Sequence, residues 1–127
     1  MKNLLIPLLT LSMISSLSAM ALQTLPQEFQ DKNKTAKVTL IEFSTPYCAS
    51  CKKLRPELES LQKKYGAKLL VHHLNAEQEA SQKHVDTFKV DTAPTFFIYN
   101  AKNRLLKRVN GDITPSQLRT IITQAEN

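Results

Sequence analysis

The chain has 127 residues and a formal net charge of +6 at pH 7. A chain of this length forms one domain with a modest hydrophobic core. Its basic residues are spread along the sequence in short pairs without interleaved aromatic residues, so we expect no nucleic-acid groove and no nucleic-acid partner.

The first residues, MKNLLIPLLTLSMISSLSAMA, have the layout of a secretory signal peptide. Lys2 supplies a positive charge, an uncharged apolar stretch follows, and residues 19–21 match an A-x-A cleavage site. We therefore expect residues 1–21 to be a signal peptide, residues 22–127 to be the mature domain, and the protein to be periplasmic. The alternative is an uncleaved membrane anchor, although the apolar stretch barely reaches the length that spans a bilayer.

Residue patterns in the first half of the domain predict a strand, a helix and a second strand. A short helix over residues 26–31 precedes VTLIEF (38–43), which has the composition of a buried central strand. Leucines at helical spacing predict an amphipathic helix over 49–65, which Gly66 ends. A second strand is predicted over 67–75.

The second half predicts a polar helix over 76–88, then a hairpin of strands over 95–100 and 104–109. Residues 114–117, TPSQ, have the pattern of a capping box and begin a last helix. The order is β-α-β-α-β-β-α. It predicts an α/β fold with a mixed four-stranded sheet and helices on both faces.

The chain has two cysteines, Cys48 and Cys51, at the start of the helix predicted over 49–65. A disulfide between them closes too short a loop to stabilise the fold much, and a structural zinc site would need four ligands. The unpaired N–H groups of a helix N-terminus stabilise a thiolate, and residues three apart on a helix bring their sulfurs within bonding reach. The pattern therefore predicts a pair that opens and closes, with Cys48 the exposed nucleophile and Cys51 the sulfur that resolves a mixed disulfide.

Glu42 is a carboxylate inside the apolar strand over 38–43, six residues before Cys48. Burial disfavours the charged form of a carboxylic acid. A poised acid beneath the cysteines could therefore move the proton of Cys51 during exchange. The alternative is a glutamate at the strand end that reaches solvent.

The residues around the cysteines resemble those of the thioredoxin superfamily. Pro56, five residues after Cys51, matches the proline in the active-site helix of the family. DTAPTFFIYN (91–100) resembles the segment with the cis-proline, and VNG (109–111) resembles the V-x-G loop. The resemblance implies a thioredoxin-like fold and an exported thiol:disulfide oxidoreductase. The segment ahead of Val38 is short, so the first strand of the family is either absent here or adds a fifth strand.

The resemblance also implies roles for individual residues. Pro94 would follow a cis peptide bond, face the cysteines and, with Ala93 and Tyr47, line a groove for extended protein substrates; the alternative is an ordinary trans turn. Glu42 matches the buried acid of the family. His73 stands where the family often has a lysine beside that acid, so the sequence allows either a Glu42–His73 pair or a histidine with local hydrogen bonds.

Two departures from the family pattern lie at the cysteines, and the second bears on the direction of electron flow. Tyr47 stands in place of the usual tryptophan, and the dipeptide Ala49-Ser50 between the cysteines offers no imidazole to stabilise a thiolate. We therefore predict a reductase or isomerase rather than a strong oxidant. We also expect the protein to be a monomer. It would act on protein thiols and disulfides, exchange electrons with a membrane partner, and use only the Cys48–Cys51 disulfide, without a metal or other cofactor.

Two other functions stay open. The cysteines could bind or deliver Cu(I) as soft thiolate ligands, although Pro94 facing them would obstruct that site. The domain could also be a redox-inert interaction module. Metal content tests the first of these alternatives, and an insulin-reduction assay tests the second.

Overall fold

The computed structural model describes residues 23–30 and 34–127, so the predicted signal peptide lies outside the described residues. The helices are α2 (Gln27–Gln30), α3 (Ala49–Tyr65), α4 (Gln82–Thr87) and α5 (Pro115–Glu126). The strands are β1 (Val38–Ser44), β2 (Leu69–Asn75), β3 (Thr95–Asn100) and β4 (Leu105–Asn110).

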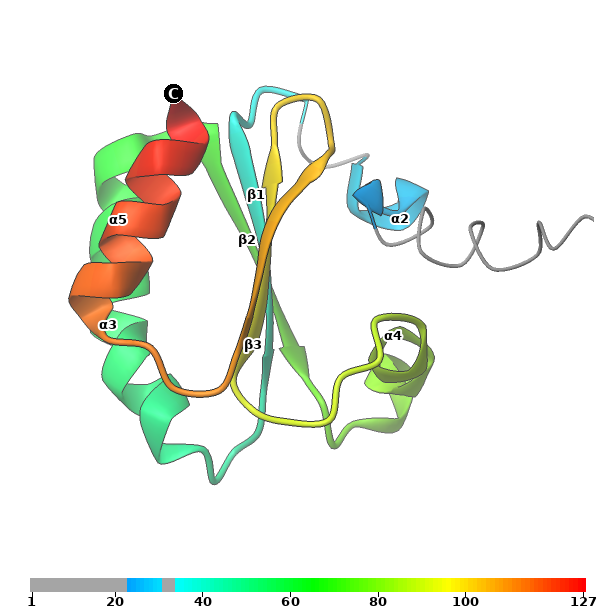
Figure 1. Ribbon diagram of the computed structural model, residues 1–127. Coiled ribbons are helices and arrows are strands. Elements are labelled where there is room, and N and C mark those ends of the chain that lie inside the picture. Colours follow the sequence, from blue (N-terminus) through cyan, green and yellow to red (C-terminus); the bar gives the residue numbers. More distant parts are fainter. Residues whose placement is uncertain (1–22, 31–33) are drawn as a thin grey trace, which may run out of the picture.

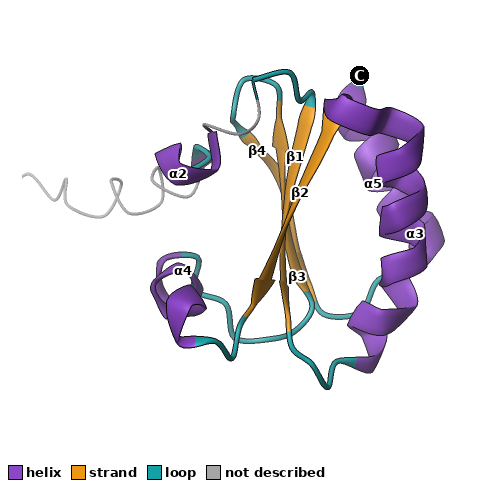
Figure 2. Cartoon of the chain, turned by 180° about the vertical axis from the view of Figure 1, so that it is seen from behind, coloured by secondary structure: helices purple, strands orange, loops and turns teal. Residues whose placement is uncertain are grey.

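The strands form one mixed sheet in the order β2-β1-β3-β4. β1 is parallel to β2 and antiparallel to β3, and β3 and β4 form an antiparallel hairpin. Helices α3 and α5 cover one face, and α2 and α4 lie on the other (Figures 1 and 2). The predicted four-stranded sheet with helices on both faces is confirmed. Ahead of β1, the described residues contribute a single bridge from Thr24 to Arg104 rather than a fifth strand.

The helix predicted over 76–88 is shorter than expected. A turn follows β2, in which the side chain of Asn75 accepts a hydrogen bond from the backbone N–H of Glu77 at 2.9 Å. A 3-10 turn (Glu79–Ser81) comes next, and only then does α4 begin. Asparagine side chains that bond the backbone two residues on compete with helix formation, which explains the late start.

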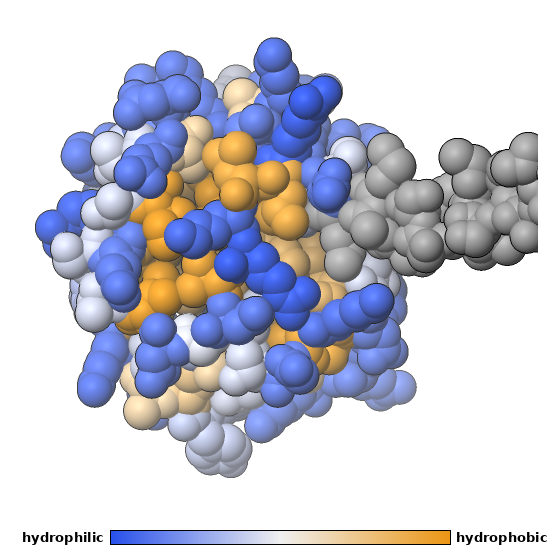
Figure 3. All heavy atoms as spheres, in the orientation of Figure 1, coloured by the Kyte–Doolittle hydropathy of each residue, from blue (hydrophilic) through white to orange (hydrophobic). Residues whose placement is uncertain are grey.

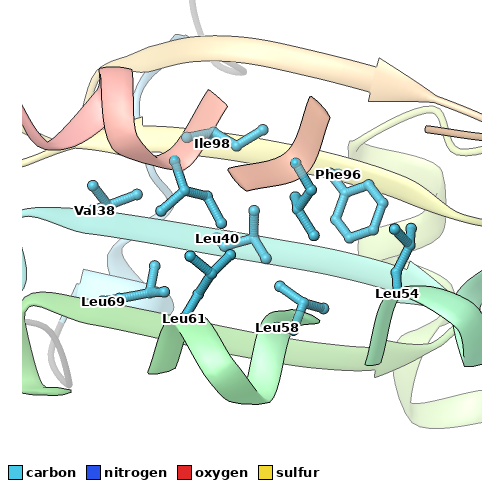
Figure 4. Close-up of a cluster of buried hydrophobic side chains, with 10 residues drawn as sticks. Val38, Leu40, Leu54, Leu58, Leu61, Leu69, Phe96 and Ile98 are labelled. Carbon is cyan, nitrogen blue, oxygen red and sulfur yellow. The ribbon is translucent and has the colours of Figure 1, made fainter. Parts of the chain in front are cut away.

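The face under α3 and α5 is mainly aliphatic. Leu40 of β1 and Ile98 of β3 pack against leucines that α3 presents one helical turn apart (Figure 4). Helix α5 adds Leu118 and Ile122. It begins with the predicted capping box: Gln117 N donates to Thr114 Oγ1 at 3.1 Å, and Thr114 N donates to Gln117 Oε1 at 2.8 Å.

The face under α2 and α4 is mainly aromatic. Phe88, at the end of α4, lies 4.8 Å from Phe97 and 5.5 Å from Phe43 between ring centroids. Tyr99 and Ile41 belong to the same buried cluster. Because α4 has six residues, it presents few side chains to the sheet, and large rings fill the space instead.

The two edges of the sheet are β2 and β4, and β4 is nearest the reader in Figure 1. On this side, apolar surface lies to either side of a band of polar side chains (Figure 3). Across residues 23–30 and 34–127, no helix has the length and apolar character that crossing a bilayer requires.

Candidate active site

Cys48 and Cys51 form a disulfide at the N-terminus of α3. Cys48 is the N-cap residue, and its Sγ accepts a hydrogen bond from the backbone N–H of Cys51 at 3.1 Å. This N–H is one of the donors that have no partner within the helix at its N-terminus. The structure therefore points a free helix donor at the sulfur that was predicted to become the thiolate.

The prediction that Cys48 is exposed is wrong for the disulfide form. Cys48 is 9% exposed and Cys51 is 3% exposed, so both belong to the buried residues. As an N-cap, Cys48 folds its side chain over the first turn of the helix and bonds to Cys51 there, which explains the low exposure. Cys48 remains the more accessible of the two cysteine residues.

The loop before β3 lies at the same end of the sheet as the disulfide. Thr95, the first residue of β3, pairs with Phe43 near the end of β1, from which the chain runs on to Cys48. The Ala93–Pro94 peptide bond is cis. The carbonyl oxygen of Pro94 accepts a hydrogen bond from Gly111 N at 2.8 Å, which joins this loop to the one after β4.

The three residues predicted to line a substrate groove differ in exposure. Tyr47 is 87% exposed, which is more than any other large hydrophobic residue within 23–30 and 34–127. Ala93 is half-buried and Pro94 is buried. The structure thus places an exposed aromatic ring directly before Cys48, and the cis-proline loop at the same end of the sheet.

Glu42 is buried, at 4% exposed, so the alternative of a glutamate that reaches solvent is wrong. It pairs in register with His73 of β2, and Glu42 Oε1 lies 3.2 Å from His73 Nδ1. The second carboxylate oxygen, Oε2, is buried without a hydrogen-bond partner in the described part of the chain. The side chain of His73 is about half exposed, so this pair connects a buried acid to the surface.

The Glu42 side chain shares the sheet face of Leu40, which is the face that α3 covers, because side chains alternate along a strand. A hollow beside it is lined by Glu42 and His73 from the sheet and by residues of α3 that begin with Arg55. Arg55 is one helical turn after Cys51. The acid therefore lies beneath the helix that carries the disulfide.

The sequence interpretation missed two polar contacts near the site. Ser50 Oγ donates a hydrogen bond to Asp112 Oδ1, across 62 residues of sequence. Arg108 donates to the carbonyl oxygens of Phe88 and Lys89, at 2.9 Å each, and so holds the start of the loop that leads to the cis-proline. The position of Asp112 directly after the VNG segment is a signal in the sequence, but its partner is set by the fold.

The predicted site holds no metal, and a Cu(I) site at the two cysteines was kept only as an alternative function. In the stretches 23–30 and 34–127, no group of three or more His, Cys, Asp or Glu side chains is arranged to hold a metal ion.

A disulfide at a helix N-terminus, on a mixed sheet with a cis-proline loop beside it, defines the class of thiol–disulfide oxidoreductases. The family model described as thioredoxin matches residues 20–124. The chain therefore belongs to the thioredoxin family.

Among curated proteins, the chain is similar to chloroplastic thioredoxin X of Arabidopsis thaliana, with 31% identity over 90 residues. That match covers 70% of this chain but only 48% of the relative. It is also similar to thioredoxin of Buchnera aphidicola, with 28% identity over 102 residues, which cover 80% of this chain and 92% of the relative. Among solved structures, the Deadhead thioredoxin of Drosophila melanogaster has a TM-score of 0.64 at 22% identity, covering 75% of this chain and 87% of that one.

Proposed function

We propose that this protein exchanges the Cys48–Cys51 disulfide or dithiol with protein substrates in the cell envelope, and that it acts there as a reductant. The observation that carries the proposal is the hydrogen bond from Cys51 N to Cys48 Sγ. In the reduced state, the same donor stabilises a thiolate at Cys48, and the thiolate is the form that attacks disulfides.

The reaction proceeds in two exchanges. The Cys48 thiolate attacks one sulfur of a substrate disulfide, forms a mixed disulfide and releases the other substrate sulfur as a thiolate. The Cys51 thiol then loses its proton and attacks Cys48 Sγ, which releases the second substrate sulfur. Two electrons pass to the substrate, and the Cys48–Cys51 disulfide of the structure is the product.

Glu42 is the proposed acceptor of the Cys51 proton. It lies beneath α3, and its Oε2 has no hydrogen-bond partner in the described ranges 23–30 and 34–127. That oxygen therefore has a lone pair free for a proton. His73 touches the other oxygen at 3.2 Å and is half exposed. The imidazole therefore connects the carboxyl group to solvent, and a proton that moves to Oε1 can leave by that route.

Tyr47, Ala93 and Pro94 are the proposed substrate groove. The exposed ring of Tyr47 offers apolar contact area directly beside Cys48. The loop at Ala93 offers backbone groups to an extended peptide, a mode of recognition that tolerates many sequences because it reads the main chain.

The location and the direction of electron flow are further parts of the proposal. The signal-peptide layout of residues 1–21 supports export and a mature chain that begins at Leu22. The Ala49-Ser50 dipeptide, which has no imidazole, supports a reductant. Because the bacterial periplasm keeps thiols oxidised, a reductant there needs electrons from a membrane partner. Mass spectrometry of the protein from the periplasmic fraction checks the cleavage site.

An insulin-reduction assay tests the activity, with Cys48→Ser and Cys51→Ser as matched variants. We expect the wild-type protein to accelerate reduction by dithiothreitol and both variants to lose that acceleration. Cys51→Ser should also accumulate a mixed disulfide with substrate, because the resolving sulfur is gone. A wild-type protein no faster than dithiothreitol alone would contradict the proposal.

A further inference from the structure

The hydrogen bond between Ser50 and Asp112 ties the active-site helix to the loop between β4 and α5. Ser50 is the second residue of α3 and lies between the two cysteines in sequence. Asp112 is exposed and follows Gly111, whose positive φ of 79° turns the chain out of β4. The contact therefore holds a carboxylate against the first turn of the helix that Cys48 caps.

This position matters because a helix N-terminus favours negative charge. The Cys48 thiolate and the Asp112 carboxylate lie at the same N-terminus, so each raises the free energy of the other charge. The disulfide carries no charge and does not experience this repulsion. A carboxylate held here consequently destabilises the reduced, thiolate form relative to the disulfide.

We propose that Asp112, held by Ser50, is a positioning residue that makes the Cys48–Cys51 pair more reducing. The inference rests on the proposed function and deepens it, since it assigns the reductant character to a named charge. It also gives Ser50 a role: this residue supplies no imidazole, and it anchors an acid instead.

The positive charge of Lys53 lies near the negative charge of Asp112. A hollow between α3 and the start of α5 is lined by Ser50, Lys53 and Asp112, with uncharged residues completing its wall. Lys53 offsets part of the field of Asp112. Removing Lys53 should therefore shift the equilibrium between dithiol and disulfide toward the disulfide, whereas removing the carboxylate should shift it toward the dithiol.

The experiment is the equilibrium of the full protein with a glutathione redox buffer, measured for wild type and Asp112→Asn. The asparagine oxygen can still accept from Ser50, so this change removes the charge and keeps the contact. Where Cys48 is ionised, we expect the variant to favour the dithiol about two- to fivefold more, because an exposed charge at a helix terminus changes the free energy by about 0.3–1 kcal/mol. That change corresponds to a rise of about 10–20 mV in potential.

Three further variants separate charge from structure. Ser50→Ala keeps the charge but releases it, so a smaller shift in the same direction is expected. Lys53→Met should shift the equilibrium toward the disulfide. Asp86→Asn makes the same chemical change on α4, on the other face of the sheet, and should leave the equilibrium unchanged.

The pH profile gives the sharpest readout. Repulsion acts on the thiolate alone, so the curves of wild type and Asp112→Asn should converge at low pH, where both thiols are protonated. Absorbance of the thiolate at 240 nm should show Cys48 ionising at lower pH in the variant. Equal potentials above the thiolate transition, or an equal shift in Asp86→Asn, would overturn the inference. A wild-type potential typical of a strong oxidant would contradict the proposed reductant function. The difference in potential between wild type and Asp112→Asn would still test the role of Asp112.

Discussion

The two faces of the sheet are built differently, although they are made from alternate residues of the same strands. The face under α3 and α5 is aliphatic and contains the disulfide helix and the buried acid Glu42. The face under α2 and α4 is packed mainly with aromatic rings, with Phe88 at its centre. The face with the disulfide and the buried acid is covered by helices of 17 and 12 residues, whereas α4 on the other face has six residues.

The difference shows how this fold accommodates a buried carboxylate. Along β1, Ile41 and Phe43 point to the aromatic face, whereas Leu40 and Glu42 point to the aliphatic one. Burying an acid with one unpartnered oxygen costs stability. The tightly packed rings on the opposite face contribute stability that offsets this cost without touching the site.

Truncating the aromatic face should have the largest effect on stability. For Phe88→Ala we expect a loss of about 3–5 kcal/mol in the free energy of unfolding, because a buried ring leaves a cavity among its neighbours. Urea unfolding measures the loss. The potential of the cysteine pair, measured below the unfolding transition, should stay at the wild-type value; a changed potential would mean that the two faces are coupled.

Replacing the acid should separate stability from activity. Glu42→Leu removes a buried unpartnered oxygen, so we expect it to stabilise the fold by about 1–3 kcal/mol. It should also slow resolution of the mixed disulfide by about 100-fold, because the proton acceptor is lost. Urea unfolding and stopped-flow exchange with a model disulfide provide the two measurements. Unchanged resolution would remove Glu42 from the mechanism.

The helix caps of the two faces should respond unequally. Thr114 caps α5 through its side chain, whereas Ser81 at the start of α4 makes no such bond. Thr114→Ala should therefore cost about 1 kcal/mol, and Ser81→Ala should cost less. Thermal and urea unfolding of the two variants provide the comparison, and an equal or reversed order would show that the caps do not distinguish the faces.

The smallest effect should come from a partly exposed ion pair on the face of the disulfide. Arg119 of α5 donates to Glu57 of α3 at 2.7 Å and 3.2 Å, and this hydrogen bond lowers the pKa of Glu57 below its usual value of 4.5. The folded state thus favours the ionised form. The stabilisation is present above pH 4.5 and is lost as the pH falls through the lowered pKa.

Glu57→Gln checks this linkage. The variant should be slightly less stable than wild type at pH 7, and the difference should vanish in acid. Urea unfolding at both pH values measures it, and a difference that persists in acid would rule out ionisation of Glu57 as its cause.

Much of the fold follows from local patterns. Short apolar runs predict β1 and β3, and the TPSQ segment predicts the start of α5, because each signal lies within a few residues. The start of α4 escaped prediction, since the polar segment after Asn75 suits a turn as well as a helix. The contact of Ser50 with Asp112 also escaped it, because tertiary structure brings these residues together across 62 positions.

The site was predictable where spacing decides the geometry. Two cysteines three positions apart at a helix start must lie close, and the disulfide is found there. The pairing of Glu42 with His73 was left open by the sequence, because register between strands is not a local property. The low exposure of Cys48 depends on how the first turn of α3 packs, which composition does not reveal.

The equilibrium reduction potential of the Cys48–Cys51 pair in wild-type protein tests the central claim most directly. A value near about −270 mV or below is the predicted result, and it would mark a reductant that a partner must recharge. A value near about −120 mV would mark an oxidant that donates its disulfide to substrates, and would contradict the account.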